Sequence, residues 1–354
     1  MVLRSLPMFH VCLALWTLCS CWGCGSAGTE GFANTRSAAK PLRIVATTGM
    51  VADLVRHIAG EHGDVMALIG SGVDPHLFKA TRYDIKKMHE ADVVFYSGLM
   101  LEGRLQEVLK QVNSSNRPVV AVTDRLDHAY LRSPPDFEGH FDPHVWMDVA
   151  AWSRCVDWVD ETLSKIDPVH ADQFHQNAKA YQTELAELHE YVRKVIASIP
   201  ESQRVLVTAH DAFGYFGRTY GIEVRSIQGV TTESEAGIQD VNRLVDFLVE
   251  RKLPAIFVES SVNGKNIHAV IEGTKSRNVS IRIGGELFSD AMGTEGTYEG
   301  TYIGMIDHNA TRIAHALGGA APDNGLHGRL TTQPGAAVSQ KPQLGPAFAV
   351  SLVR

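Results

Sequence analysis

The stretch PVHADQFHQNAKAYQTELAELHEYVRKVIASIP, residues 168–200, decides how the rest of the chain is divided. It begins and ends with proline and contains no proline or glycine in between. Proline suits the first turn of a helix and ends a helix when it comes later, so the stretch predicts one uninterrupted helix. At about 1.5 Å per residue it is roughly 45 Å long, enough to lie along two lobes. We therefore expect a single rigid connection between lobes and not a hinge of extended strands.

Short β-branched runs alternate with helical segments on both sides of this helix. The predicted strands lie at 42–49, 64–70, 92–98 and 117–123 before the helix, and at 204–211, 222–229, 254–260 and 279–284 after it. This alternation is typical of parallel sheets covered by helices. The sequence predicts an α/β protein with two lobes, at 41–167 and 201–318, each with a mostly parallel sheet flanked by helices.

The composition allows two globular domains and excludes some partners. The chain has 354 residues, of which 44% are hydrophobic, and its formal net charge is −7. Such a length and composition can build two substantial cores. The negative charge argues against a nucleic-acid partner, whereas a cation experiences a mildly favourable field.

The first 27 residues have the features of a secretory signal. Arg4 precedes an apolar run over 8–19 that is too short to span a bilayer comfortably. Two later cysteines are candidates for lipid attachment: Cys21, which has a leucine three residues before it, and then Cys24. Ordinary cleavage near Ala27 is the alternative, and the sequence leaves the choice open. Because only Cys155 lies in the body of the chain, a disulfide framework is excluded.

Two further segments have simple interpretations. Residues 319–354 are rich in glycine, proline, alanine and glutamine without periodicity, which predicts a loosely attached low-complexity tail. Within the second lobe, TTESEA at 231–236 fits the start of a helix over 235–252. Thr232 and Glu235 have the spacing of a capping box at this start.

The tripeptide Asp-Pro-His occurs twice, in VDPHLF at 73–78 and in FDPHVW at 141–146. Proline fixes its own φ and pushes the residue before it toward extended backbone, so each loop can hold an imidazole in one orientation. A turn with a surface histidine is the alternative for each copy. The repetition makes His76 and His144 candidate ligands of one metal ion.

Three residues at predicted strand ends in the second lobe are further candidates. His210 falls just past the end of the strand predicted from the apolar run at 205–207, and ligands collect outside the carboxyl ends of strands in open α/β sheets. Asp290 also follows a strand, although a carboxylate in such a loop is more often a turn or helix cap. Glu259 ends a strand and could accept a hydrogen bond from a metal-bound imidazole.

Five segments together resemble a known family: VDPHLF, FDPHVWMD, VTAHDAFGYF, LPAIFVESS and IGGELFSDAMG. They are similar to the metal-binding subunits of ABC-type uptake systems for zinc and manganese, and the likeness runs from about Pro41 to Gly318. The resemblance implies an extracytoplasmic, monomeric solute-binding protein that holds one divalent ion between its lobes and delivers it to a permease in the cytoplasmic membrane. The implied ligands are His76, His144, His210 and Asp290, and only the choice of Asp290 depends on the family.

Three imidazoles and a carboxylate favour Zn²⁺ over Mn²⁺, which prefers oxygen-rich sites. Manganese relatives generally have a glutamate at the position of His210, and many zinc relatives have a long histidine-rich loop that this chain lacks. Both ions are therefore candidate cargo, and zinc is the first choice. A zinc hydrolase and a surface adhesin are the alternatives, but no HExxH-type motif is present, and an adhesin leaves the repeated Asp-Pro-His unexplained.

Overall fold

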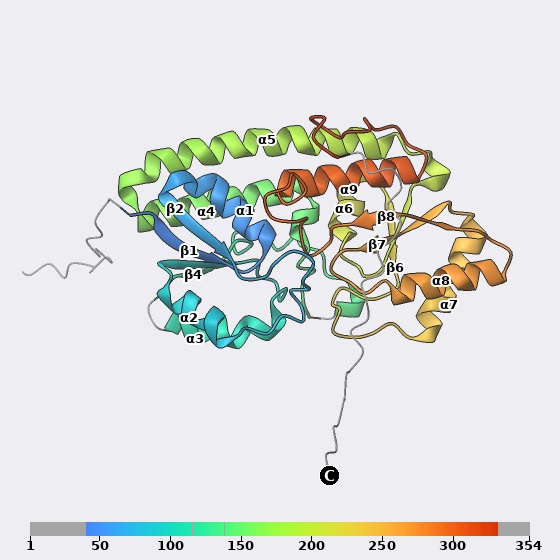
Figure 1. Cartoon of the computed structure of the whole chain (residues 1–354), viewed down its shortest axis with the longest axis horizontal. Coiled ribbons are helices and arrows are strands. Elements are labelled where there is room, and N and C mark those ends of the chain that lie inside the picture. The colour runs from blue at the N-terminus through green and yellow to red at the C-terminus, as the bar shows by residue number, and fades with distance from the viewer. Residues whose placement is uncertain (1–39, 115–116, 138, 332–354) are drawn as a thin grey trace, which may run out of the picture. The chain divides into compact units, whose positions relative to one another are not determined.

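The computed structural model describes residues 40–114, 117–137 and 139–331, and the first lobe contains one parallel sheet (Figure 1). The strand order is β2-β1-β3-β4. The strands are β1 (Leu42–Ala46), β2 (Gly63–Ala67), β3 (Val93–Tyr96) and β4 (Val119–Ala121). The helices are α1 (Gly49–Ala59), α2 (Arg82–Glu90) and α3 (Gln106–Ser114). All four strands predicted before residue 168 are confirmed.

Alternation along the strands explains how helices cover both faces of this sheet. Ile44 and Phe95 pack into the core that contains α1, whereas their neighbours Val45 and Val94 pack against α2 and α3. Successive side chains of a strand point to opposite faces, so a strand buried on both sides is apolar throughout. The sheet is therefore the middle of three layers, and its carboxyl ends carry the loops of the site.

The second lobe differs in plan from the first. Its four strands form two parallel pairs, β5 (Val205–Thr208) with β6 (Glu223–Ser226) and β7 (Ala255–Glu259) with β8 (Arg282–Leu287). The helices are α6 (Gly214–Tyr220), α7 (Ile238–Arg251), α8 (Lys265–Ser276) and α9 (Tyr302–Ala316). The strands predicted here are confirmed, but they do not join into one ladder as they do in the first lobe.

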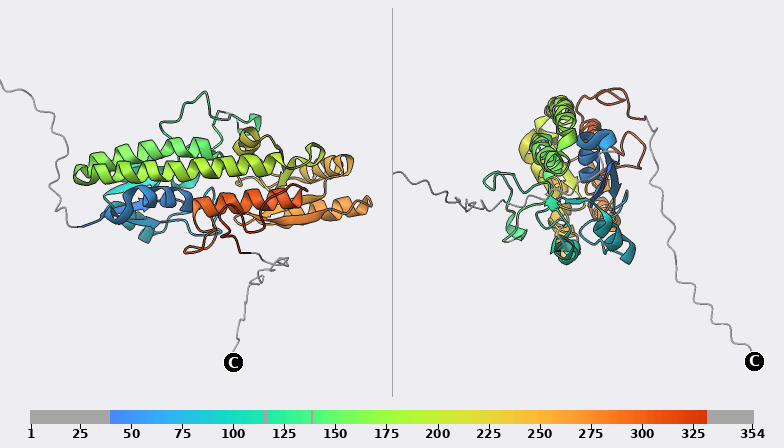
Figure 2. Two further views of the ribbon diagram at one scale, coloured as in Figure 1. Left: turned by 90° about the horizontal axis from the view of Figure 1, so that it is seen from above. Right: turned by 90° about the vertical axis from the view of Figure 1, so that its left-hand side faces the viewer.

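The long helix is α5 (Ala171–Ala197), and a 3₁₀ turn at Pro168–His170 precedes it. The α-helix is thus slightly shorter than the predicted stretch and measures about 40 Å. It runs beside α4 (Val149–Ile166) and contacts both α1 of the first lobe and α9 of the second (Figure 2). One helix therefore braces both lobes, as the sequence predicts.

The largest hydrophobic core follows α5 and is continuous between the lobes. It joins side chains of α1 and α4, such as Trp152, with side chains of α9, such as Tyr302, under the buried face of α5. Two separate cores lie farther from α5, one beneath α2 and α3 and one around α7 and α8. The lobes thus share apolar packing on the α5 side and have independent cores on the other side.

Residues 319–331 fold against α9, so the prediction of a loose tail is wrong for them. The Asp307 carboxylate accepts the Leu326 N–H, and Leu330 is buried. A few apolar side chains and one buried acceptor are enough to fix a segment that is otherwise rich in glycine and proline. Residues 332–354 and the signal segment 1–27, with Cys21 and Cys24, lie outside the described residues. Within the described part of the chain, no helix has the length and hydrophobicity to cross a bilayer.

Candidate metal centre

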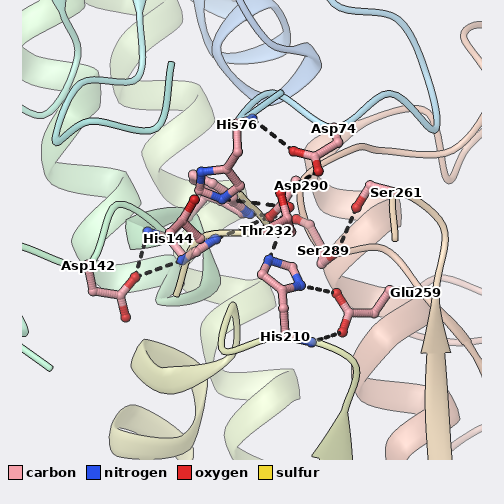
Figure 3. A network of polar contacts seen from close by, with 12 residues as sticks. Asp74, His76, Asp142, His144, His210, Thr232, Glu259, Ser261, Ser289 and Asp290 are labelled. Atoms are coloured by element: carbon pink, nitrogen blue, oxygen red, sulfur yellow. Dashed lines mark hydrogen bonds and ion pairs between the residues drawn. The ribbon is translucent and has the colours of Figure 1, made fainter. Parts of the chain in front are cut away.

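Four side chains predicted as ligands meet at one point (Figure 3). His76 lies in the loop after β2, and His144 begins the 3₁₀ turn Val145–Met147 before α4. His210 follows β5, and Asp290 follows β8. All four are buried, with His76 the most exposed at 2%. The first lobe thus contributes two groups and the second lobe two, which is the arrangement that the family resemblance implies.

The distances within this cluster suit a tetrahedral ion. Nε2 of His210 lies 3.1 Å from Oδ2 of Asp290, and Nε2 of His144 lies 3.3 Å from Oδ1. Nε2 of His76 lies 4.0 Å from Oδ2 of Asp290, and one atom of each residue lies within 4.8 Å of all the others. Ligands about 2.0–2.1 Å from a tetrahedral zinc ion are roughly 3.3 Å apart, so His144 and His210 already lie at such a distance from Asp290, and His76 lies slightly farther from it.

The polar atoms at the centre lack hydrogen-bond partners. Nε2 of each of the three histidines and both carboxylate oxygens of Asp290 are buried, and none has a partner in hydrogen-bond geometry. Leaving one buried polar atom unsatisfied costs about 1–3 kcal/mol, so five such atoms facing one another need an explanation. A cation bound between them satisfies all of the lone pairs at once.

Two of the imidazoles are oriented by carboxylates on their other nitrogen. Nδ1 of His144 lies 2.8 Å from Oδ1 of Asp142, and Nδ1 of His210 lies 2.6 Å from Oε2 of Glu259. These contacts fix the tautomer that leaves Nε2 free for an ion and make the nitrogen more basic. Among the described residues, no carboxylate lies against Nδ1 of His76. The hydrogen bond predicted for Glu259 is confirmed.

The three histidines have different protonation in the absence of an ion. Burial lowers the pKa of His76 to about 3. Burial also disfavours the charge on His144, but Asp142 and Asp290 outweigh it and raise the pKa to about 9. In the same way Asp290 and Glu259 overcome burial and raise the pKa of His210 well above its usual range. The metal-free centre therefore holds two imidazolium groups and one neutral imidazole.

The carboxyl of Asp290 is ionised in this arrangement. Burial disfavours its charge, but His210 and His144 outweigh burial and hold its pKa well below the usual range. Asp142 and Glu259 lie behind the imidazole rings of His144 and His210, on the side away from the centre. Three carboxylates thus surround the point where the imidazole nitrogens converge, which favours a divalent cation over an anion or a neutral ligand.

Other contacts hold the loops of the two lobes together. The Trp146 indole N–H donates to the Ser289 carbonyl at 2.9 Å, which links the His144 loop to the Asp290 loop. The Tyr302 hydroxyl in turn donates to the Trp146 carbonyl at 2.6 Å. The Tyr215 hydroxyl donates to the Asp142 carbonyl at 2.9 Å. These bonds fix the position of the His144 loop relative to the second lobe.

Arg132 pairs with Asp142 across a glycine. The guanidinium lies directly against Gly214, so a Cβ at this position would force the end of the Arg132 side chain to shift. Arg132 also lies 3.6 Å from the carboxylate of Asp211, the residue after His210. A single cation therefore contacts the neighbours of two candidate ligands.

Sequence reasoning missed several of these neighbours. Asp142 and Asp74 carry the signal of the repeated tripeptide, since each aspartate precedes a candidate ligand by two residues, but their hydrogen bonds were not predicted. The predicted capping box at Thr232 is wrong: α7 begins at Ile238, and Gly237 and Asp240 form its first turn. Trp146 lies two residues after His144, and Arg132 lies ten residues before Asp142, but the local sequence does not show that Trp146 bonds Ser289 or that Arg132 reaches Asp211, because those partners are far away in the chain.

Comparison with known proteins identifies the family. The family model described as "Zinc-uptake complex component A periplasmic" matches residues 44–316. The manganese-binding lipoprotein MntA of Bacillus subtilis is 47% identical over 316 residues, which are 89% of this chain and 100% of that protein. The zinc-binding protein TroA of Treponema pallidum is 46% identical over 305 residues, which are 85% of this chain and 98% of that protein.

A solved structure has the same fold. The periplasmic zinc-binding protein TroA from Treponema pallidum superposes with a TM-score of 0.76 at 47% identity, over 78% of this chain and 99% of that one. The match covers both lobes and the helix between them, and the family model covers all four candidate ligands. The chain belongs to the family of zinc-uptake component A, the solute-binding proteins of ABC transporters for zinc and manganese.

Proposed function

We propose that this chain captures one divalent transition-metal ion outside the cytoplasm and delivers it to an ABC permease in the cytoplasmic membrane. The ligands in this proposal are His76, His144, His210 and Asp290. The observation that carries it is the set of five unpartnered, buried donor atoms that converge from both lobes. Relatives with names for zinc and manganese binding support the class of cargo.

The donor set favours zinc, with manganese as a second cargo. Three nitrogens and one carboxylate are the borderline-soft set that zinc accepts in tetrahedral geometry. Manganese stands at the weak end of the affinity order and prefers oxygen, so zinc wins a direct competition at equal concentration. The relatives carry both names at nearly equal identity, so availability of the ion outside the cell decides the physiological load.

Binding without chemistry is what this arrangement supports. A catalytic zinc site keeps three protein ligands and a position for water, with a general base close by. Here four protein groups fill a tetrahedral set, and the nearby carboxylates Asp142 and Glu259 are engaged with the Nδ1 atoms of two ligands. Neither the hydrolase nor the adhesin alternative receives support from the comparisons.

Attachment to the membrane surface is part of the proposal. Several relatives are named lipoproteins. We place the lipid on Cys21, with Cys24 as the second candidate. Mass spectrometry of the mature N-terminus distinguishes the two, and a free amino terminus near residue 28 would contradict lipid attachment altogether.

The experiment that tests the ligand set combines metal analysis with thermal stability. Protein purified without added metal is analysed for its elements, stripped and titrated with Zn²⁺ and Mn²⁺ in competition. Metal that binds only the native state adds RT ln(1 + [L]/Kd) to the free energy of unfolding, about 4 kcal/mol at a thousandfold excess over Kd. We expect His210→Ala to lose most of this gain.

His175→Ala is the matched control, because this histidine lies on α5 with more than half of its side chain exposed. We expect the control to keep the full stabilisation by zinc. A His210→Ala variant that is stabilised as strongly as the wild type would show that the ligand assignment is wrong. Metal-dependent hydrolytic turnover by the same sample would revive the enzyme alternative.

A further inference from the structure

The loop 227–237, between β6 and α7, forms hydrogen bonds near two of the candidate ligands, His210 and His76. At its base, the Gln228 N–H donates to the Ala209 carbonyl at 2.9 Å, directly beside His210. The Gln228 side chain also donates to the Ser234 carbonyl at 3.1 Å, which closes the loop on itself. Its middle is buried, since Val230 is 2% and Thr232 9% exposed. The loop is therefore a packed element of the second lobe.

The middle of this loop reaches the first lobe through one buried polar contact. The Thr232 hydroxyl donates to Oδ2 of Asp74 at 2.5 Å (Figure 3). The other oxygen of Asp74 accepts the backbone N–H of His76 at 2.8 Å. A hydrogen-bonded path thus runs from the second lobe through one carboxylate to the backbone of a ligand in the first lobe.

His76 depends on this path more than the other ligands depend on their neighbours. The imidazoles of His144 and His210 are held by carboxylates on Nδ1, whereas His76 has none there among the described residues. His76 is also the ligand farthest from Asp290, and Leu77 beside it is 38% exposed. The position of its ring therefore follows from the position of its backbone, which Asp74 fixes.

We propose that Thr232 is a positioning residue that keeps His76 among the ligands and so controls how fast the bound ion escapes. This inference rests on the proposed function and adds a regulatory contact to the same site. In the described structure the Thr232 hydroxyl bonds Asp74 and forms no hydrogen bond with a ligand side chain. While its hydroxyl bonds Asp74, the end of the loop that carries His76 stays closed against the second lobe; the start of that loop is held separately, by the Ser71 hydroxyl, which donates to the Gly293 carbonyl at 2.9 Å. When that bond opens, His76 is the ligand free to leave with its loop, because the other three are held by buried contacts within and between the lobes.

The direct test measures release of zinc from the loaded full-length protein into an excess of chelator. Thr232→Val keeps the shape and removes the hydroxyl. A hydrogen bond to a charged group contributes enough that its loss corresponds to a release rate about tenfold faster or more. Thr232→Ala is a second variant without the hydroxyl, and Thr232→Ser restores it, so we expect Ser to return the rate to within about twofold of the wild type.

Thr231→Val is the matched control, because among the described residues the Thr231 hydroxyl accepts a backbone N–H of its own loop, from Glu233 at 3.3 Å, and bonds no residue of the other lobe. We expect no change in its release rate. A double-mutant cycle locates the effect: if Thr232 acts through Asp74, Thr232→Val adds nothing in an Asp74→Ala background. Cobalt(II)-loaded Thr232→Val should also show an altered d–d spectrum, because a nitrogen leaves the coordination sphere in part of the molecules.

The outcomes separate this inference from the proposed function. A wild-type protein that takes up neither zinc nor manganese would remove both. A wild type that binds zinc, together with Thr232→Val and Thr232→Ala variants that release it at the wild-type rate, would overturn the positioning function alone. An equal acceleration by Thr231→Val, or an undiminished effect of Thr232→Val in the Asp74→Ala background, would overturn it as well.

Discussion

The two Asp-Pro-His loops have the same three residues and different surroundings. In both, one aspartate oxygen accepts the backbone N–H of the histidine. Asp74 accepts it from His76, and Asp142 accepts it from His144. Asp142 also contacts the imidazole Nδ1 of His144 and pairs with Arg132. Asp74 contacts no imidazole in the described structure, and its free oxygen binds Thr232 of the other lobe.

This difference separates a fixed ligand from an adjustable one. His144 is held at its ring, inside the core shared by the lobes and next to the buried bond between Trp146 and Ser289. His76 is held only at its backbone, in a loop that bonds the second lobe through the Asp74–Thr232 contact beside it and, farther along, through the Ser71 hydroxyl, which donates to the Gly293 carbonyl. The same tripeptide therefore holds one ligand, His144, in a fixed position and the other, His76, in a position from which it can move away.

Removal of either histidine should have the largest effect and should also separate the two loops. We expect both His144→Ala and His76→Ala to abolish most of the stabilisation by zinc, since each removes a ligand. The metal-free proteins should differ, because His144 is a buried cation whose loss leaves carboxylates unpaired. Breaking such a pair costs about 3–5 kcal/mol. Denaturant unfolding of the stripped variants measures this, and equal losses for the two would contradict the comparison.

Substitution of the aspartates should give the next largest effect. Changing a group that orients a metal-bound imidazole typically costs 10–100-fold in affinity, so Asp142→Asn should raise the zinc Kd by about that factor. Asp74→Asn should raise it by about tenfold, at the lower end of this range, because Asp74 contacts the backbone of its histidine and not the ring. Competition with a chelator at fixed pH measures both values. A reversed order would show that the ring contact at His144 is unimportant.

Protons released on binding provide a third comparison. In the metal-free protein at pH 7, His144 is protonated because its pKa is raised to about 9, and the raised pKa of His210 has the same effect. His76 is already neutral, because its pKa is lowered to about 3. An ion must displace the protons on Nε2, so zinc binding at pH 7 should release about two protons.

The sign of the pH dependence follows from this release. Protons compete with the ion, so apparent affinity falls as the pH falls, by about 100-fold per pH unit while two protons are displaced. The dependence weakens above about pH 9, where His144 is neutral before the ion arrives. Calorimetry in buffers of different ionisation enthalpy counts the protons. A count near zero would mean that both histidines are neutral in the free protein.

The smallest effect is expected from a second contact of the 227–237 loop. Arg104 and Glu233 form an ion pair at 3.2 Å across the lobes, with side chains 38% and 49% exposed. Exposed pairs are typically worth 0–1 kcal/mol, so Glu233→Gln should change the zinc release rate by less than about threefold. A larger change than that of Thr232→Val would place control of release at the surface.

The sequence predicts the strands and the long helix because these depend on local patterns. The β-branched runs predict the strands, and the two prolines around α5 predict the helix, without any information on tertiary contacts. Three of the four candidate ligands are found in the same way, from a repeated tripeptide and a strand end. Asp290 is not, because a carboxylate in a glycine-bracketed loop serves many purposes, and the family resemblance had to select it.

What the sequence could not show depends on distant partners. Thr232 has the spacing of a capping box, but its hydroxyl bonds Asp74, which is 158 residues away. The segment 319–331 has the composition of a loose tail, yet Asp307 of α9 binds it. In both cases a long-range acceptor determines the local conformation, and a local pattern cannot reveal it.

The continuous core under α5 has a consequence for how the molecule loses its structure. Because side chains from both lobes interdigitate there, neither lobe can melt without exposing apolar surface of the other. The parts of both lobes that pack under α5 therefore unfold together, whereas the separate cores beneath α2 and α3 and around α7 and α8 are not joined in this way. An ion bound by the four proposed ligands would add its binding free energy to the stability of this shared unit.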